Sequence, residues 1–150
     1  MTQTRFNLRV YGLLINDQQE VLVSDERVVG MTFTKFPGGG LEFGEGTREC
    51  LAREWMEELN QPIEVLDHFY TTDYFQESAF RKTDQLISIY YMVRLKGPQQ
   101  FSITTRKWDF PHGTEDAHAF RWEPLSTFGA ASVKWPVDKV VADMLRNRFV

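Results

Sequence analysis

Three glutamates stand close together in the middle of the chain, at Glu54, Glu57 and Glu58. On a helix with 3.6 residues per turn they fall within an arc of about 100°. On an exposed helix their charges repel by about 0.2–0.5 kcal/mol per pair, and a divalent cation would turn that repulsion into attraction. Carboxylate oxygens suit the hard ions Mg²⁺ and Mn²⁺, whereas a zinc set is not available because Cys50 stands alone. Without further residues, however, a solvated acidic face on an ordinary surface helix remains the commoner interpretation.

The segment around these glutamates has the pattern of an amphipathic helix. Leu51, Trp55 and Leu59 are four residues apart and would form the side that packs into the core. Thr47 is the expected N-cap, and the helix should end at residue 60 because Pro62 cannot continue it. The sequence therefore predicts one helix with an acidic face beside an apolar face.

The rest of the chain supplies the elements that must position this helix. Runs rich in β-branched, aromatic and other apolar residues predict strands at residues 6–15, 21–23, 31–36, 63–75, 85–95 and 119–122. Residues 37–40, one proline and three glycines, predict an irregular loop, and residues 96–118 a long polar loop. Apolar residues at helical spacing predict a final helix over residues 136–149. We therefore expect an α/β or α+β fold that forms a single domain over residues 1–150.

Composition narrows the kinds of partner and compartment. The 150 residues are 42% hydrophobic and carry a net charge of −4, so no broad positive field is expected to hold duplex nucleic acid. The apolar runs are too short and too interrupted for a membrane-spanning helix. Because Cys50 has no cysteine partner and the first residues lack a secretory pattern, we expect a cytoplasmic protein.

The residues that flank the glutamates follow a fixed order with fixed gaps. Five residues separate a glycine from a glutamate, and seven more precede an arginine–glutamate pair, a hydrophobe, one further residue and two glutamates; these are Gly39, Glu45, Arg53, Glu54, Trp55, Glu57 and Glu58. This order resembles the Nudix box. Residues 36–40 and 121–125 also resemble the usual surroundings of that box, so the resemblance extends over about the whole chain.

The resemblance implies a fold and a metal site. The implied fold is an α/β/α sandwich with a mixed β-sheet, in which the box forms a loop, a helix and a loop. Glu54, Glu57 and Glu58 would be the catalytic acids and the ligands of Mg²⁺ or Mn²⁺, and the backbone carbonyl of Gly39 is a further candidate ligand. Glu45 and Arg53 would pair and so hold the loop to the helix.

The implied activity is hydrolysis of a phosphoanhydride bond by water attacking phosphorus. The substrate would be a small nucleotide, either a nucleoside diphosphate linked to another moiety or a nucleoside triphosphate. The general base stays open among Glu58, Glu54 and an acid from a later loop, for which Glu115 and Asp116 are candidates. The alternative is a catalytically silent Nudix-like domain that senses a nucleotide.

Weaker signals concern substrate contacts and assembly. A phosphate-bearing substrate needs positive charge beyond the metal, which Arg27 or Lys35 could provide, as could Arg81 or Lys82. His112 and His118 are more often solvated than metal-bound in such a loop. A homodimer is compatible with the sequence.

Two residues depart from the box pattern. Asn60 stands where the family has a glycine, but asparagine also adopts the left-handed conformation that ends a helix. Gln61 stands where the family has a hydrophobe, and we expect it to loosen the packing beneath the following loop.

Overall fold

The computed structural model describes residues 2–112 and 115–149 of the chain. These residues fall into two compact units, each built from separate stretches of sequence. Unit 1 contains residues up to Leu13 and the stretch Gly38–Gln100, and unit 2 contains Leu14–Pro37 and the chain from Phe101 onward. The single domain over residues 1–150 stays a prediction.

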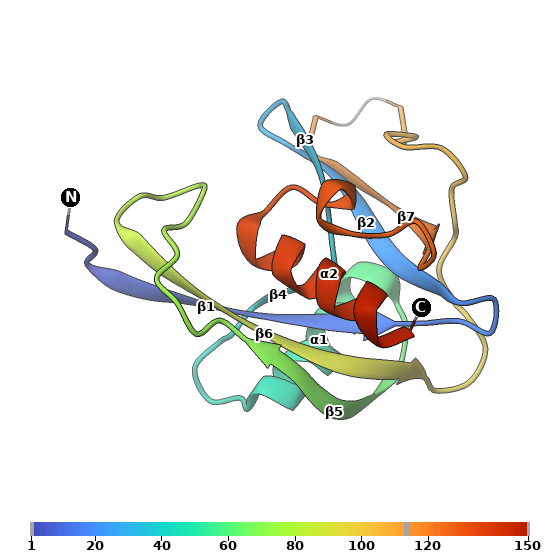
Figure 1. The fold of residues 1–150 in the computed structure, drawn as a ribbon, viewed down its shortest axis with the longest axis horizontal. Coiled ribbons are helices and arrows are strands. Elements are labelled where there is room, and N and C mark those ends of the chain that lie inside the picture. Colours follow the sequence, from blue (N-terminus) through green and yellow to red (C-terminus); the bar gives the residue numbers. More distant parts are fainter. Residues whose placement is uncertain (1, 113–114, 150) are drawn as a thin grey trace. The chain divides into compact units, whose positions relative to one another are not determined.

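Unit 1 is built on a four-stranded sheet with the strand order β4-β1-β6-β5. Its elements, shown in Figure 1, are β1 (Arg5–Leu14, whose last residue lies in unit 2), β4 (Gly38–Gly40), α1 (Thr47–Leu59), β5 (Ile63–Thr71) and β6 (Asp84–Leu95). Helix α1 packs against β4 and β5. Glu54, Glu57 and Glu58 all lie on α1.

Strand β4 is a departure from the sequence analysis, which expected residues 37–40 to form an irregular loop. Gly38, Gly39 and Gly40 pair antiparallel with β1, opposite Tyr11, Val10 and Arg9 in that order. A strand is possible here because no side chain interferes: a Cβ on Gly38 would lie 2.1 Å from the Val10 carbonyl oxygen, and the φ of Gly38 is +155°. The glycines thus bring the backbone of β4 close to β1.

The first turn of α1 differs from prediction by one residue. Gly46 is the N-cap and Thr47 the first helical residue, so the prediction of Thr47 as N-cap is wrong. The Thr47 hydroxyl shares a 2.7 Å hydrogen bond with the Tyr91 hydroxyl of β6 instead. Glu49 helps to begin the helix because its carboxylate accepts a hydrogen bond from the Gly46 N–H at 3.0 Å.

The apolar face and the end of α1 agree with prediction. Leu51, Trp55 and Leu59 are buried. Asn60 is the C-cap in the left-handed conformation, with φ 51° and ψ 36°, and its N–H donates to the Met56 carbonyl at 3.1 Å. Asn60 therefore ends the helix in the left-handed conformation that a glycine would adopt at this position.

Gln61 does not loosen the packing, and that expectation is wrong. Its side chain is fully buried, with 0% of the residue exposed. Its amide nitrogen donates to the Pro62 carbonyl at 2.9 Å, and its side-chain oxygen accepts from the Gln100 N–H at 2.7 Å. A polar residue is tolerated here because its hydrogen bonds are satisfied, and these bonds fasten the end of α1 to the chain that follows β6.

Replacing Gln61 by leucine should lower the free energy of unfolding by about 1 kcal/mol, because the hydrogen bonds of the Gln61 side chain to the Gln100 N–H and the Pro62 carbonyl are lost. Urea unfolding measures the change. Gln100→Ala is the matched control, since its bond to Gln61 uses the main chain. Equal stability of Gln61→Leu and the wild type would contradict a stabilising role for Gln61.

Unit 2 contains a three-stranded antiparallel sheet with the order β3-β2-β7. Its elements are β2 (Glu20–Val28), β3 (Met31–Lys35), β7 (Ala117–Pro124), the short 3-10 helix η1 (Ala130–Ser132) and helix α2 (Pro136–Phe149). Helix α2 has the predicted bounds. Strands β2 and β7 are longer than predicted, whereas β5 of unit 1 ends at Thr71, before the predicted residue 75.

Strand β2 continues past the predicted residue 23 and includes a buried charged residue, Asp25. Asp25 is fully buried, and both of its carboxylate oxygens accept hydrogen bonds from the Arg121 guanidinium at 2.9 Å. Thr34 donates a further hydrogen bond to Asp25 at 2.7 Å, and Glu123 also pairs with Arg121. Although burial acts to lower the pKa of Arg121, the bonds to Asp25 and Glu123 raise it above its ordinary value.

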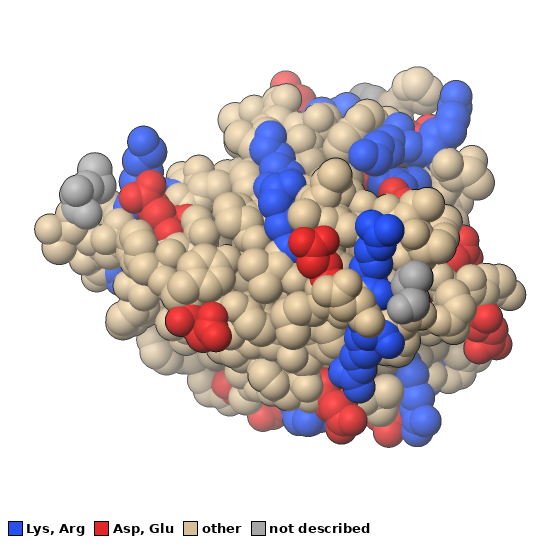
Figure 2. Space-filling view, in the orientation of Figure 1, with Lys and Arg blue, Asp and Glu red and all other residues tan. Residues whose placement is uncertain are grey.

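One face of the molecule carries side chains of both charges. On the face that Figure 2 shows, Lys and Arg side chains are interspersed with Asp and Glu. Among residues 2–112 and 115–149, no helix has the length and apolar character that crossing a membrane requires.

Candidate functional site

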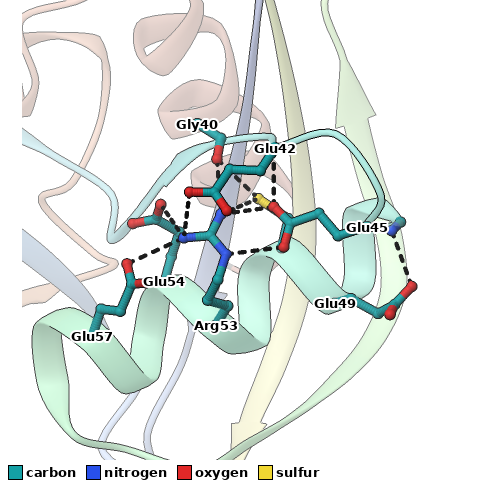
Figure 3. Close-up of polar contacts among 9 residues, drawn as sticks. Gly40, Glu42, Glu45, Glu49, Arg53, Glu54 and Glu57 are labelled. Atoms are coloured by element: carbon teal, nitrogen blue, oxygen red, sulfur yellow. Dashed lines mark hydrogen bonds and ion pairs between the residues drawn. The ribbon is translucent and has the colours of Figure 1, made fainter.

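Arg53 of α1 lies at the centre of the acidic segment of unit 1 (Figure 3). Its Nε and Nη2 donate to the two carboxylate oxygens of Glu45, at 2.9 and 2.7 Å. Its Nη2 also donates to the Gly40 carbonyl at 3.0 Å. Because Glu45 and Gly40 belong to the chain before the helix, Arg53 joins that chain segment to α1.

Further carboxylates surround the same guanidinium. Nη1 of Arg53 lies 3.0 Å from Glu54, 3.1 Å from Glu57 and 3.7 Å from Glu42. We refer to Glu42, Glu45, Arg53, Glu54 and Glu57 as the Arg53 cluster. Its four negative charges and one positive charge give a formal charge of −3. One arginine therefore leaves most of this negative charge without compensation from within the cluster.

Glu42 is the member of the cluster that sequence reasoning missed. It lies in the segment between β4 and α1, and its backbone N–H donates to Glu45 at 2.9 Å. Its side chain is 68% exposed. In the sequence, Glu42 is only an acidic residue two positions after the last glycine of β4. That position alone does not predict a place near Arg53.

Gly39 brings the backbone of β4 against Glu54. A Cβ at position 39 would lie 2.4 Å from a carboxylate oxygen of Glu54, closer than any real contact. Only glycine therefore leaves room for the Glu54 carboxylate where it now lies. Among the carbonyls of β4, that of Gly40 lies with the Arg53 cluster in Figure 3.

Glu58 completes the set that the sequence analysis proposed as metal ligands. It lies on α1, directly after Glu57, and is half-buried. Among the described residues, no three His, Cys, Asp or Glu side chains are arranged to hold a metal ion. The oxygen donors and the excess negative charge of the Arg53 cluster nevertheless suit a hard divalent cation, provided that Glu54 and Glu57 turn from Arg53 toward it.

The Arg53 cluster also fixes the protonation of Glu45. Hydrogen bonds from Arg53, followed by one from the Glu42 N–H, lower the pKa of Glu45 to about 2. The bond to Glu45 raises the pKa of Arg53 above its ordinary value. Both groups are therefore charged across the physiological range.

The lowered pKa of Glu45 predicts a pH dependence of stability. Because the folded pKa lies below the ordinary value of 4.5, Glu45 stabilises the fold above pH 4.5, and this contribution disappears as the pH falls toward 2. Denaturant unfolding across that range should show the gap between wild type and Glu45→Gln closing as the pH falls. Glu64→Gln is the control, since Glu64 pairs with the solvent-accessible Arg94 of β6. A gap that is independent of pH would contradict the assignment.

Cys50 lies behind the Arg53 cluster and is fully buried. Burial, with a smaller contribution from the Glu45 charge, raises the pKa of Cys50 to about 12. A neutral buried thiol is a poor nucleophile, so Cys50 acts as a packing group.

Four of the other candidate residues, Arg27, Lys35, Glu115 and Asp116, belong to unit 2, where they make contacts of their own. Arg27 donates to the Glu115 carbonyl at 2.6 Å and lies over the Phe110 ring at 4.9 Å. Asp116 accepts from the Val29 N–H at 3.0 Å. Lys35 is buried and pairs with Glu26 at 3.1 Å. These contacts leave their proposed roles in the substrate site as predictions.

His112 and His118, which the sequence predicted to lie in one polar loop, are both exposed. His118 lies on β7 and contacts the Phe120 ring, with ring centroids 5.1 Å apart. His112 lies directly before residues 113 and 114, which are outside the described part of the predicted loop over residues 96–118.

The chain matches a known domain family and is similar to several solved structures. A family model for the NUDIX domain matches residues 5–144. The chain is similar to the solution structure of the E. coli ORF135 protein, with a TM-score of 0.68 and 18% identity over 94% of this chain and 90% of that one.

Two further solved structures are similar to the chain. A structure of MutT, from work on Aliivibrio salmonicida and Vibrio cholerae, gives a TM-score of 0.65 and 20% identity over 97% of this chain and 100% of that one. An ADP-ribose pyrophosphatase from Streptococcus suis gives 0.60 and 13% over 95% of this chain and 90% of that one. These likenesses confirm the predicted fold class.

Proposed function

Because the chain belongs to the NUDIX domain family, we propose that it is a metal-dependent pyrophosphohydrolase that cleaves a phosphoanhydride bond of a small nucleotide. Membership bears out its identification as a Nudix hydrolase. The observation that carries the finer proposal is the Arg53 cluster, where four carboxylates surround one guanidinium beside the glycine strand β4. An excess of oxygen donors next to a strand without side chains suits a cation that itself binds phosphate oxygens.

Glu54, Glu57 and Glu58 would hold Mg²⁺ or Mn²⁺. When bound, such an ion neutralises phosphate oxygens and lowers the pKa of water. Arg53 keeps Glu45 and the Gly40 carbonyl in place while the glutamates turn, because its bonds to those two groups use other N–H donors than Nη1. The helix therefore remains joined to the preceding chain during turnover.

One carboxylate takes the proton of the attacking water. Glu54 and Glu58 are the candidates on α1, and Glu115 and Asp116 are the candidates from unit 2. Gly39 presents no side chain, so the Glu54 carboxylate can lie against the backbone of β4. The attack opens the bond between phosphorus and the bridging oxygen, and the bridging oxygen leaves with the other phosphoryl group.

The proposed substrate is a nucleoside diphosphate linked to another moiety, or a nucleoside triphosphate. The similarity to an ADP-ribose pyrophosphatase supports the first class, and positive charge from Arg27 or Lys35 would favour either. We extend the proposal to a single domain that acts in the cytoplasm.

Hydrolysis of a nucleotide panel tests this function. At least one of ADP-ribose, a nucleotide sugar, a dinucleoside polyphosphate and the nucleoside triphosphates should be cleaved with Mg²⁺ or Mn²⁺. EDTA should abolish the reaction, and added metal should restore it. In water enriched in ¹⁸O, the label should appear in a phosphate product, because water attacks phosphorus. Binding of a nucleotide with no cleavage under any of these conditions would instead identify a silent sensing domain.

A further inference from the structure

Tyr91 of β6 contacts the first turn of α1 and is only 9% exposed. Its hydroxyl shares a 2.7 Å hydrogen bond with the Thr47 hydroxyl. The guanidinium carbon of Arg48 lies 4.8 Å from the centre of its ring. His68, its partner on β5, meets the ring at 82°, with ring centroids 5.8 Å apart. One side chain of the sheet thus contacts the first two residues of α1.

The bond between Tyr91 and Thr47 is the more protected of two polar connections from this turn to the sheet. In the other, Nη1 of Arg48 donates to the Val65 carbonyl of β5 at 2.8 Å. Arg48 is exposed, so water competes for that bond, whereas Thr47 is half-buried and Tyr91 is buried. A hydrogen bond away from water is electrostatically stronger. The two hydroxyls therefore give the firmer constraint on the start of α1.

The chain directly before α1 needs such a constraint. Glu45 lies between Gly44, whose φ is +89°, and Gly46, the N-cap, which supplies no side-chain hydrogen bond to the helix. Because glycine has more backbone freedom than other residues, the local chain does not by itself hold Glu45 in place. Glu45 is held on one side by two hydrogen bonds from Arg53, shown in Figure 3. On the other side, the next fixed point is Thr47, two residues further along the chain.

We propose that Tyr91 is a positioning residue, which fixes the start of α1 through Thr47 and thereby keeps Glu45 and the rest of the Arg53 cluster in place. The inference rests on the proposed function, in which this cluster helps to form the metal site. A pair of hydroxyls suits the role because a hydrogen bond fixes a distance and a direction, whereas apolar contacts are non-directional. Loss of the bond should therefore loosen the cluster more than it destabilises the fold.

Tyr91→Phe tests the inference because it removes the hydroxyl and keeps the ring. Without metal, the Nε–H of Arg53, which donates to Glu45, should exchange with solvent about 5-fold faster, as expected for the loss of one ordinary hydrogen bond. NMR measures this rate. Binding of Mn²⁺, followed by the EPR signal of the free ion, should weaken about 10-fold, the lower end of the effect of residues that orient metal ligands.

Tyr70→Phe is the matched control. The Tyr70 hydroxyl of β5 also donates one hydrogen bond, to Asp73 at 3.0 Å, and that bond does not involve α1. Tyr70→Phe should therefore match the wild type in both exchange at Arg53 and Mn²⁺ affinity.

Variants of Thr47 test whether Tyr91 acts through this residue. Thr47→Val should reproduce both effects of Tyr91→Phe, and Thr47→Ser should resemble the wild type because it keeps the hydroxyl. The double variant of Tyr91→Phe with Thr47→Val should be no worse than either single variant, since both remove the same bond. Additive losses in the double variant would overturn the inference.

Wild-type exchange at Arg53 and wild-type Mn²⁺ affinity in Tyr91→Phe would also overturn the inference. A lower melting temperature alone would not rescue it, because Tyr91 would then be structural only. If Tyr91→Phe does not fold, Thr47→Val and Thr47→Ser decide by the same two readouts. If the wild type binds no Mn²⁺ and cleaves no nucleotide, the proposed function fails, while the exchange rate at Arg53 still decides whether Tyr91 positions the cluster.

Discussion

Alanine at position 39 is expected to lower kcat/KM about 100-fold and to leave the fold intact, because small displacements of a reacting group have effects of this size. The new Cβ would lie 2.4 Å from a carboxylate oxygen of Glu54. That oxygen is at the far end of a flexible side chain, so Glu54 can swing aside at little cost in stability. The loss should approach that of Glu54→Gln, since both variants remove the same carboxylate from its position.

The matched control lies one residue away. A Cβ at Gly40 would meet its nearest atom at 3.5 Å, an ordinary contact, and Gly40→Ala should therefore keep most of the activity. Steady-state kinetics on the substrate found in the panel, with thermal unfolding of both variants, make the comparison. Full activity in Gly39→Ala, or an equal loss in Gly40→Ala, would contradict the importance of the Glu54 position.

Removal of the Asp25 carboxylate is expected to lower the free energy of unfolding by about 3–5 kcal/mol, because it leaves a buried guanidinium without its main partner. Arg121 is 7% exposed and donates two hydrogen bonds to Asp25. Glu123 would still pair with Arg121, but Thr34 would lose its acceptor as well. Denaturant unfolding of Asp25→Ala measures the effect.

Two comparisons make the Asp25 result specific to a buried ion pair. Glu64→Ala breaks the solvent-accessible pair with Arg94 and should cost less than about 1 kcal/mol. The double variant Asp25→Leu with Arg121→Leu should be more stable than Asp25→Ala, since it leaves no unpaired guanidinium. A loss in Asp25→Ala as small as that in Glu64→Ala would contradict this account.

Local sequence predicts the fold well where local interactions decide it. The period of Leu51, Trp55 and Leu59 predicted α1, and Pro62 predicted its end, because both signals come from residues within one or two turns. Strand β2 was predicted too short because its apolar run ends at residue 23, whereas the strand continues through the buried Asp25. Its partner, Arg121, is 96 residues away in sequence, and no local pattern reveals that pairing.

The contacts of the candidate site were also predicted from the sequence only in part. The spacing of the box predicted that Glu45 and Arg53 would pair, and the structure places them 2.7 Å apart. The spacing did not predict that the same guanidinium would also engage Glu54 and Glu57. Nor did it predict that Gly39 would form a strand opposite Val10, because that pairing depends on contact between distant segments.

The discontinuous make-up of the two units has a consequence for the order in which the chain folds during synthesis. All of unit 1 has been made once residue Gln100 leaves the ribosome, whereas unit 2 must wait for the chain from Phe101 onward. The stretch Leu14–Pro37 is thus made early but lacks strand β7, its neighbour in the sheet, until late. Unit 1 is expected to fold first, and during that interval β2 exposes an unpaired strand edge on which nascent chains can associate.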